Sequence, residues 1–257
     1  MQGDLSIALS LLYGFALTLV RIAGIFVFLP FPGTHSGPGA ARVVLALACT
    51  FALLPQWPLV ERVLTTGDFV AFIVREALLG LLTGVATGFI AEAFLIAAQV
   101  LSLPAGYAYA STFDPNTQAD SGILLILSQL MAGLLFFAFG LDRHLIRAFA
   151  DSLISYPPGT FTANGALVEE LTRAGTAMFS VAVRLAMPIV GLLLLVDVAM
   201  GVLGRLNAHM QIVSVSMPVK MLITIALLAS MMAVIPRVYE RHADIVLTAV
   251  RGFLVRR

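Results

Sequence analysis

Charged side chains inside apolar stretches are the residues of this sequence whose types and spacing could do chemistry. Glu76 and Glu92 stand at the two ends of a four-residue repeat within the apolar run 69–103. Further charges within or near apolar runs include Arg21, Arg75, Arg184 and Asp197. Ionisable groups at membrane depth pair with one another in a bundle interior, or they relay protons or ions. Because acids and arginines are similar in number, the sequence favours ion pairs, between helices or between subunits, over a relay.

Glycines continue the repeat between the two glutamates, at Gly80, Gly84 and Gly88. Residues four apart lie nearly one above another on a helix, so these positions form one narrow stripe. Small residues allow a second helix to approach backbone to backbone in lipid. The stripe predicts close helix packing, either against neighbouring subunits or within one polytopic chain.

The connection between the third and fourth apolar runs is neither a charged loop nor a continuous apolar helix. It mixes small residues with aromatics and then turns, and its candidate site residues are Gly106, Tyr107, Tyr109, Phe113, Asp114 and Pro115. Irregular backbone near membrane depth survives only when it is buried in protein or lines an aqueous cavity. The residues leave two interpretations open, a pore-lining or plugging loop and a plain interfacial turn.

Signatures of catalysis and of cofactor binding are missing from the sequence. It has no Gly-x-Ser-x-Gly elbow, no His-Glu-x-x-His and no phosphate-cradling Gly-x-x-x-x-Gly-Lys. No second His or Cys stands at ligand spacing from His144, so we expect no metal site. The net charge of +1 provides no basic field for nucleic acid. We therefore expect a protein that is not an enzyme and has no cofactor.

Composition identifies the elements that must position these residues. With 60% apolar and 11% charged residues and a mean hydropathy of +1.00, the chain is predicted to be an integral membrane protein throughout, with the lipid bilayer among its partners. Its apolar runs are 5–29, 40–54, 69–103, 122–141, 173–203 and 212–236. As a helix, the third run would be roughly 50 Å long against a hydrocarbon core of ~30 Å. It must tilt, bend, or leave the bilayer while buried in protein.

The expected fold is an all-α polytopic membrane protein with about six hydrophobic helical segments. These would form helical hairpins, with a long bent third helix and a re-entrant-like loop, in a single integral membrane domain over 1–257. Its expected parts are a first half over 1–141 with the loop 106–122, a polar loop over 142–172, a C-terminal helical hairpin over 173–236 and a basic tail over 237–257. The distribution of arginine and lysine leaves the orientation in the membrane open.

Taken in order, these segments resemble the FliR family of flagellar biosynthetic proteins, and less closely its counterpart in type III secretion injectisomes. The resemblance rests on Arg21, Pro30, Arg42, Glu76, Gly80, Gly84, the Gly106 to Pro115 loop, His144, Ser152, Pro157, Arg205, Pro218 and Lys220. The chain departs from the family where Pro-Gln-x-Asn is common, since it has Ala208, His209, Met210 and Gln211 there. Ser216 and Asp142 also stand where the family has glycine.

The resemblance implies a subunit of the export gate of a flagellar-type secretion system, in the bacterial inner membrane at the flagellar basal body. It implies assembly with other small membrane subunits into a helical pore that conducts unfolded secreted proteins. It assigns the plug of the closed pore to residues 106–122, and it places Arg205, Pro218 and Lys220 at the last-hairpin loop. The alternative is a small secondary transporter or ion channel, which intramembrane charges and broken apolar runs would suit.

Overall fold

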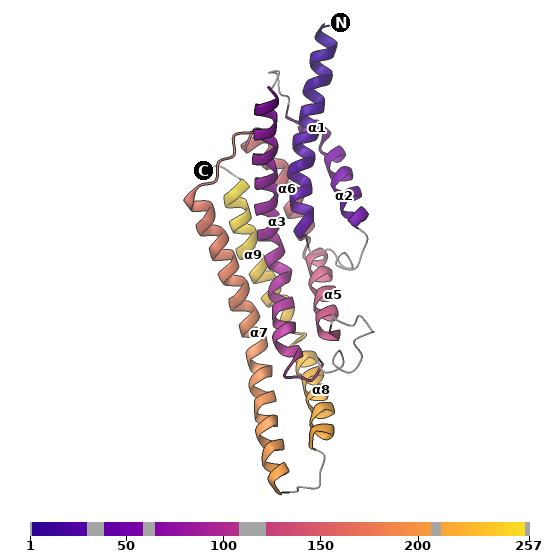
Figure 1. The fold of residues 1–257 in the computed structure, drawn as a ribbon, viewed down its shortest axis with the longest axis vertical. Helices are drawn as coiled ribbons and strands as arrows, with labels where there is room; N and C mark the ends of the chain where they lie inside the picture. Colours follow the sequence, from indigo (N-terminus) through magenta and orange to yellow (C-terminus); the bar gives the residue numbers. More distant parts are fainter. Residues whose placement is uncertain (1, 30–38, 59–64, 108–121, 207–211, 255–257) are drawn as a thin grey trace. The chain divides into compact units, whose positions relative to one another are not determined.

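The computed structural model describes residues 2–29, 39–58, 65–107, 122–206 and 212–254 (Figure 1). All regular structure within these residues is helical, which confirms the all-α prediction. The elements are α1 (Gln2–Phe28), α2 (Gly39–Ala52), the short 3-10 helix η1 (Leu54–Gln56), α3 (Thr66–Ser102), α5 (Ile123–Ala138), α6 (Leu141–Ser155), α7 (Gly165–Leu206), α8 (Ile212–Met231) and α9 (Ile235–Leu254).

Three of the described helices, α1, α3 and α7, are long and apolar enough to cross a membrane. Two further pairs qualify only when joined, since α5 and α6 are bent by 63° and α8 and α9 by 66° at short breaks. The described part therefore offers three to five spans, which agrees with a polytopic membrane protein. The overlong third run is one helix of 37 residues, and α2 is a shorter apolar helix.

The polar segment 142–172 was expected to be a surface loop, and that expectation is wrong for most of its length. Helix α6 occupies its first half, and α7 already begins at Gly165. The buried residues of α6 recur at helical spacing and are Leu141, Leu145, Ala148, Phe149, Ser152 and Leu153. Charged residues on the opposite face of this helix gave the segment its loop-like polarity.

The C-terminal boundaries also differ from expectation. The predicted hairpin over 173–236 is formed by the longer α7 with α8, and most of the predicted basic tail over 237–257 is helix α9. This helix buries apolar positions such as Val246 and Val250 and exposes charged ones such as Arg241. The charged residues of this amphipathic helix led to its prediction as a polar tail, as they led to the prediction of a loop at α6.

The helices group into two compact units. The first unit contains the described residues of 1–89, 136–176 and 243–257, and the second contains those of 90–135 and 177–242. The limits between the units fall inside α3, α5, α7 and α9, and the single membrane domain stays a prediction. In the first unit α2 folds back along α1 (Figure 1). In the second, Tyr239 donates a hydrogen bond to Ala132 O at 2.9 Å and so ties α9 to α5.

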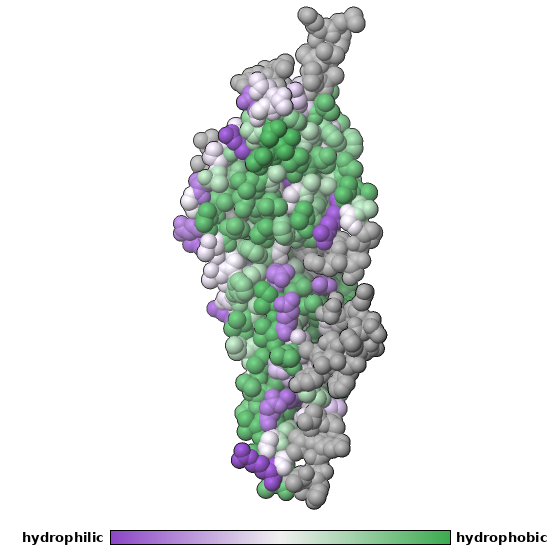
Figure 2. Space-filling view, viewed as in Figure 1, coloured by the Kyte–Doolittle hydropathy of each residue, from purple (hydrophilic) through white to green (hydrophobic). Residues whose placement is uncertain are grey.

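The described surface is dominated by apolar side chains. Figure 2 shows green, apolar residues over most of the face drawn, with polar residues in small separate groups. Many large apolar side chains are exposed, including Leu195, Val198 and Leu222. A surface of this kind is suited to contact with lipid or with other membrane subunits rather than water.

Candidate functional site

A buried charge pair joins α1 to α3 in the first unit. Arg21 donates from Nε to Oε2 of Glu76, and each side chain is only 1% exposed. Both residues belong to this chain. Of the two alternatives left open by the sequence, a pair between helices and a pair between subunits, the first therefore applies to Glu76.

The remaining polar atoms of the pair are bonded to the backbone around the end of α6. Arg21 Nη1 donates to Ser152 O at 3.1 Å and to Ser152 Oγ at 3.2 Å, and Nη2 donates to Tyr156 O at 3.0 Å. The N–H of Gly159 donates to Oε1 of Glu76 at 3.1 Å. The last carbonyls of a helix lack partners within it and carry the negative end of its dipole. The guanidinium therefore also caps α6.

Gly159 fits this position because of its backbone. Its φ is +76°, a conformation that residues with a side chain rarely adopt, and a Cβ there would overlap the ring of Phe72. Arg75, expected in an ion pair, instead donates from its guanidinium to the carbonyl oxygen of Gly159. The turn after α6 is thus held against α3 through both its N–H and its C=O.

We refer to Arg21, Glu76, Ser152, Tyr156 and Gly159 as the Arg21 cluster. Both charges in it are paired and further hydrogen-bonded, and a satisfied network of this kind fixes an arrangement rather than passing protons along. Removing one partner of such a pair leaves an uncompensated buried charge at a cost of ~3–5 kcal/mol. The cluster therefore holds α1, α3 and the end of α6 together.

The glycine stripe of α3 packs against the backbone of α1. A Cβ on Gly84 would lie 2.7 Å from Gly24 O, and one on Gly80 would overlap the backbone of Arg21. Gly88 continues the contact less tightly, at 3.1 Å from a backbone oxygen of α1. Close packing through these glycines is what the spacing predicted. At these three glycines the expected contact with a neighbouring subunit is wrong, because α1 of the same chain covers them.

The first two residues of the expected plug, Gly106 and Tyr107, pack against α8 within the second unit. Gly106 has a φ of +87°, and a Cβ there would be 3.0 Å from Met217 Sδ. The hydroxyl of Tyr107 donates to Met221 O at 3.2 Å. Partial burial raises the pKa of the Tyr107 phenol above its ordinary value, so it remains a neutral donor at physiological pH. The other expected plug residues lie outside the described residues and are Tyr109, Phe113, Asp114 and Pro115.

The last hairpin contains a second ion pair, between Asp197 of α7 and Lys220 of α8. The two side chains are 45% and 9% exposed, so the lysine is buried and the carboxylate is not. Pro218 and Lys220 lie inside α8, and their expected place in a loop is therefore wrong. Arg205 is in the last turn of α7. Residues 207–211, where the chain departs from the family pattern, lie outside the described residues.

Two residues that were predicted to form ion pairs, Glu92 and Arg184, have no partner within the described residues. Glu92 on α3 and Arg184 on α7 are both exposed, and neither forms an ion pair or hydrogen bond within the described parts of the chain. The residues next to Glu92 in α3 and next to Arg184 in α7 are apolar. The ion pairs expected for them are not present in the described structure, and contacts to other subunits stay a prediction.

Comparison with known sequences identifies the family of this chain. Residues 12–245 match the family described as bacterial export proteins, family 1. The chain belongs to this family. The match takes in α3 with its glycine stripe, the Arg21 cluster and the last hairpin of this export protein.

Similar proteins carry the name flagellar biosynthetic protein FliR. The one from Escherichia coli (strain K12) is 27% identical over 217 residues, which are 84% of this chain and 83% of that protein. The one from Bacillus subtilis (strain 168) is 26% identical over 250 residues, 93% and 94% of the two chains. The one from Caulobacter vibrioides is 23% identical over 239 residues, 91% and 94%. These similarities indicate a component of the flagellar export apparatus and do not favour a small secondary transporter or ion channel.

Sequence reasoning did not assign three of the five residues of the Arg21 cluster to a site. Ser152, Tyr156 and Gly159 act through backbone atoms or a hydroxyl, and no charge pattern marks them. Two signals were available, the helical spacing of the apolar residues in 141–153 and the glycine directly after Pro157-Pro158. Together they place a helix end and a turn with positive φ in this segment.

Proposed function

We propose that this family member is one subunit of the membrane pore through which unfolded flagellar proteins are exported. It would act in the bacterial inner membrane, at the flagellar basal body, in a hetero-oligomer with other small membrane subunits. The observation that carries the proposal is the family match over residues 12–245, nine-tenths of the chain, with relatives named for flagellar biosynthesis. In this role the chain itself does no chemistry.

The exposed charges support partnership with other subunits. Glu92 and Arg184 lie on apolar helices without a partner in the described residues. A charge on such a surface is costly in lipid, and it becomes acceptable when another protein supplies the opposite charge. We assign these two residues to contacts with neighbouring subunits. The Arg21 cluster and the glycine stripe serve the chain's own packing.

The connection after α3 is proposed to plug the closed pore. Gly106 and Tyr107 fix its start on α8 through Met217 and Met221. The following residues, up to Gly122, would form the plug, with aromatic side chains filling the conduit and Asp114-Pro115 setting its bend. Flexible methionine side chains beside its anchor suit a surface that must seal and reopen.

Deleting residues 108–113 tests this role. The deletion keeps the contacts of Gly106 and Tyr107 with α8, so the assembly should still form. The variant should co-purify with the same membrane proteins as the unchanged chain. Cells that express it should take up a small membrane-impermeant dye. A chain lacking only residues 255–257 provides the control and should stay tight. An assembled deletion variant whose membranes are as tight as the control would rule out the plug.

A further inference from the structure

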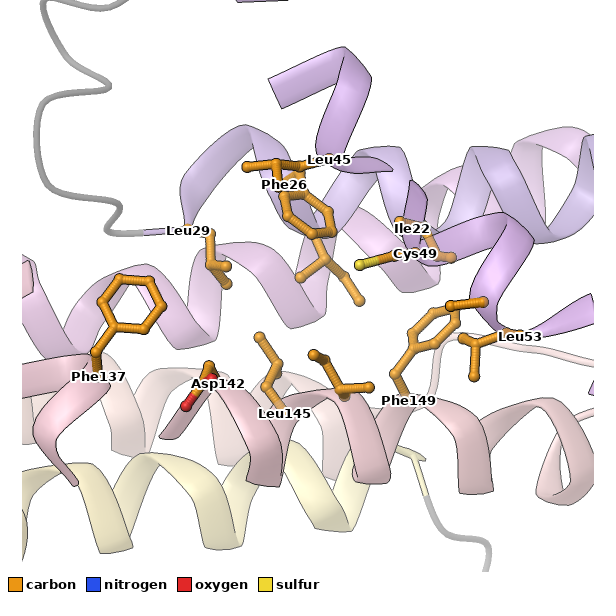
Figure 3. Close-up of a pocket in the computed structure, with 13 residues that line it drawn as sticks. Ile22, Phe26, Leu29, Leu45, Cys49, Leu53, Phe137, Asp142, Leu145 and Phe149 are labelled. Atoms are coloured by element: carbon orange, nitrogen blue, oxygen red, sulfur yellow. The ribbon is translucent and has the colours of Figure 1, made fainter. Parts of the chain in front are cut away.

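An apolar cavity of about 250 Å³ lies between α1, α2 and α6 in the first unit (Figure 3). Its wall consists almost entirely of aliphatic and aromatic side chains, such as Ile22 and Phe26 from α1, Leu45 from α2 and Leu145 from α6. An apolar cavity of roughly 150 Å³ already stays dry and binds benzene or xenon. This one has room for a longer stretch of hydrocarbon.

A single carboxylate, that of Asp142, interrupts the apolar wall. Asp142 lies in the first turn of α6. Its carboxylate has no hydrogen bond or ion pair within the described residues. The cavity is therefore apolar with an unmatched negative charge, and its occupant should be apolar with a positive charge.

The one carboxylate lies toward one end of the cavity, and the opposite end is apolar. Figure 3 shows Asp142 near Leu29 and Phe137, whereas Cys49, Leu53 and Phe149 gather at the other end. An occupant that satisfies both ends must have a cationic head and an apolar tail. This is the build of an amphiphile and not of a compact solute.

The position of the cavity along α1 indicates that the amphiphile is a membrane lipid. Helix α1 is one of the candidate spans, and the cavity follows it from Ile22 to Leu29, directly after its last residue. At 1.5 Å per residue, these seven residues cover about 10 Å. The end of a span lies near the lipid headgroups, and the residues before it lie at the depth of the acyl chains. The carboxylate is thus at the end of the cavity that is closer to the headgroups.

We propose that this cavity binds one acyl chain of a phospholipid whose headgroup carries a positively charged amine, with the amine paired to Asp142. Phosphatidylethanolamine has this chemistry. Both headgroups carry a negative phosphate, but phosphatidylglycerol has no ammonium group to pair with Asp142 and brings a net negative charge. Charge complementarity therefore makes the amine lipid the preferred ligand.

The test uses the full chain purified together with its membrane neighbours and reconstituted into vesicles of phosphatidylethanolamine and phosphatidylglycerol. Either lipid is added in trace amount with a photoactivatable group on its acyl chain, and mass spectrometry locates the cross-links. We expect cross-links around Cys49 and Leu53, with a yield about fivefold higher for phosphatidylethanolamine, as one partly exposed ion pair provides. Equal yields for both lipids, or no cross-link to the cavity wall, would overturn the proposal.

Two changes sharpen the test. Asp142→Asn should lower the phosphatidylethanolamine yield to that of phosphatidylglycerol, and Asp151→Asn, at an exposed position of the same helix, should change neither. Cys49, the only cysteine of the chain, can also be alkylated with N-ethylmaleimide, which fills the apolar end without changing a charge. This should abolish the cavity cross-links of both lipids. If alkylation leaves them unchanged, or if the lipid cross-links only to neighbouring subunits and not to the cavity wall, the proposal is wrong.

Discussion

Helix α3 has the same residue type at the two ends of its stripe and opposite surroundings there. Glu76 is 1% exposed and is bonded to Arg21 and to the N–H of Gly159. Glu92, sixteen residues further along, is exposed and has no partner within the described residues. The spacing of four defines a face of the helix, but what covers that face changes along its length. One end is satisfied within the chain, and we propose that the other contacts a neighbouring subunit.

The comparison separates two roles that intramembrane charges can have. A buried pair with further hydrogen bonds is satisfied by its own chain and fixes the packing of three helices. An exposed charge on an apolar helix contributes little to the chain's own stability, but it constrains which partners can bind. Changes at the two ends should therefore have different readouts, chain stability at Glu76 and association at Glu92.

The largest effect should come from Glu76→Ala. It leaves the Arg21 guanidinium buried without a counter-charge and Gly159 N–H without an acceptor. We expect a loss of ~3–5 kcal/mol of stability, visible as a lower unfolding midpoint in mild detergent and a lower level of the chain in membranes. A variant with unchanged stability would show that the Arg21 cluster does not hold the helices together.

A smaller loss is expected for Gly84→Ala, which tests the close contact between α3 and α1. The added methyl group would lie 2.7 Å from Gly24 O, so the helices must move apart at a cost of ~1–3 kcal/mol. Gly67→Ala makes the same change at a position of α3 with nothing within 4 Å, and should not destabilise the chain. Equal thermal unfolding midpoints for the two variants would contradict the packing described for the stripe.

Much of the fold could be predicted from the sequence because apolar length and glycine spacing are local patterns. The run 69–103 is one long helix, and Gly80 and Gly84 do pack closely against another helix. The sequence could not predict that α1 is the helix that packs against these glycines. Whether a small-residue face meets its own chain or another depends on the tertiary path of α1, which the spacing does not encode.

The amphipathic helices α6 and α9 show the opposite limitation. Their charged faces made segments 142–172 and 237–257 look like a loop and a tail, although buried residues such as Leu145 and Val246 recur at helical spacing. The partners of Arg21 around Ser152 could therefore not be placed either. In a chain this apolar, reading every charged segment as a surface loop overlooks helices that expose one face.

Glu92→Ala provides the most direct test of the central claim, that the exposed end of the stripe binds other subunits and the buried end does not. Affinity-tagged chains with Glu92→Ala or with no change are purified from membranes in mild detergent, and both unfolding and the yield of co-purified export subunits are measured. The account predicts an unchanged unfolding midpoint with a clear loss of the co-purified subunits. Full co-purification by a variant that unfolds like the unchanged chain would contradict it.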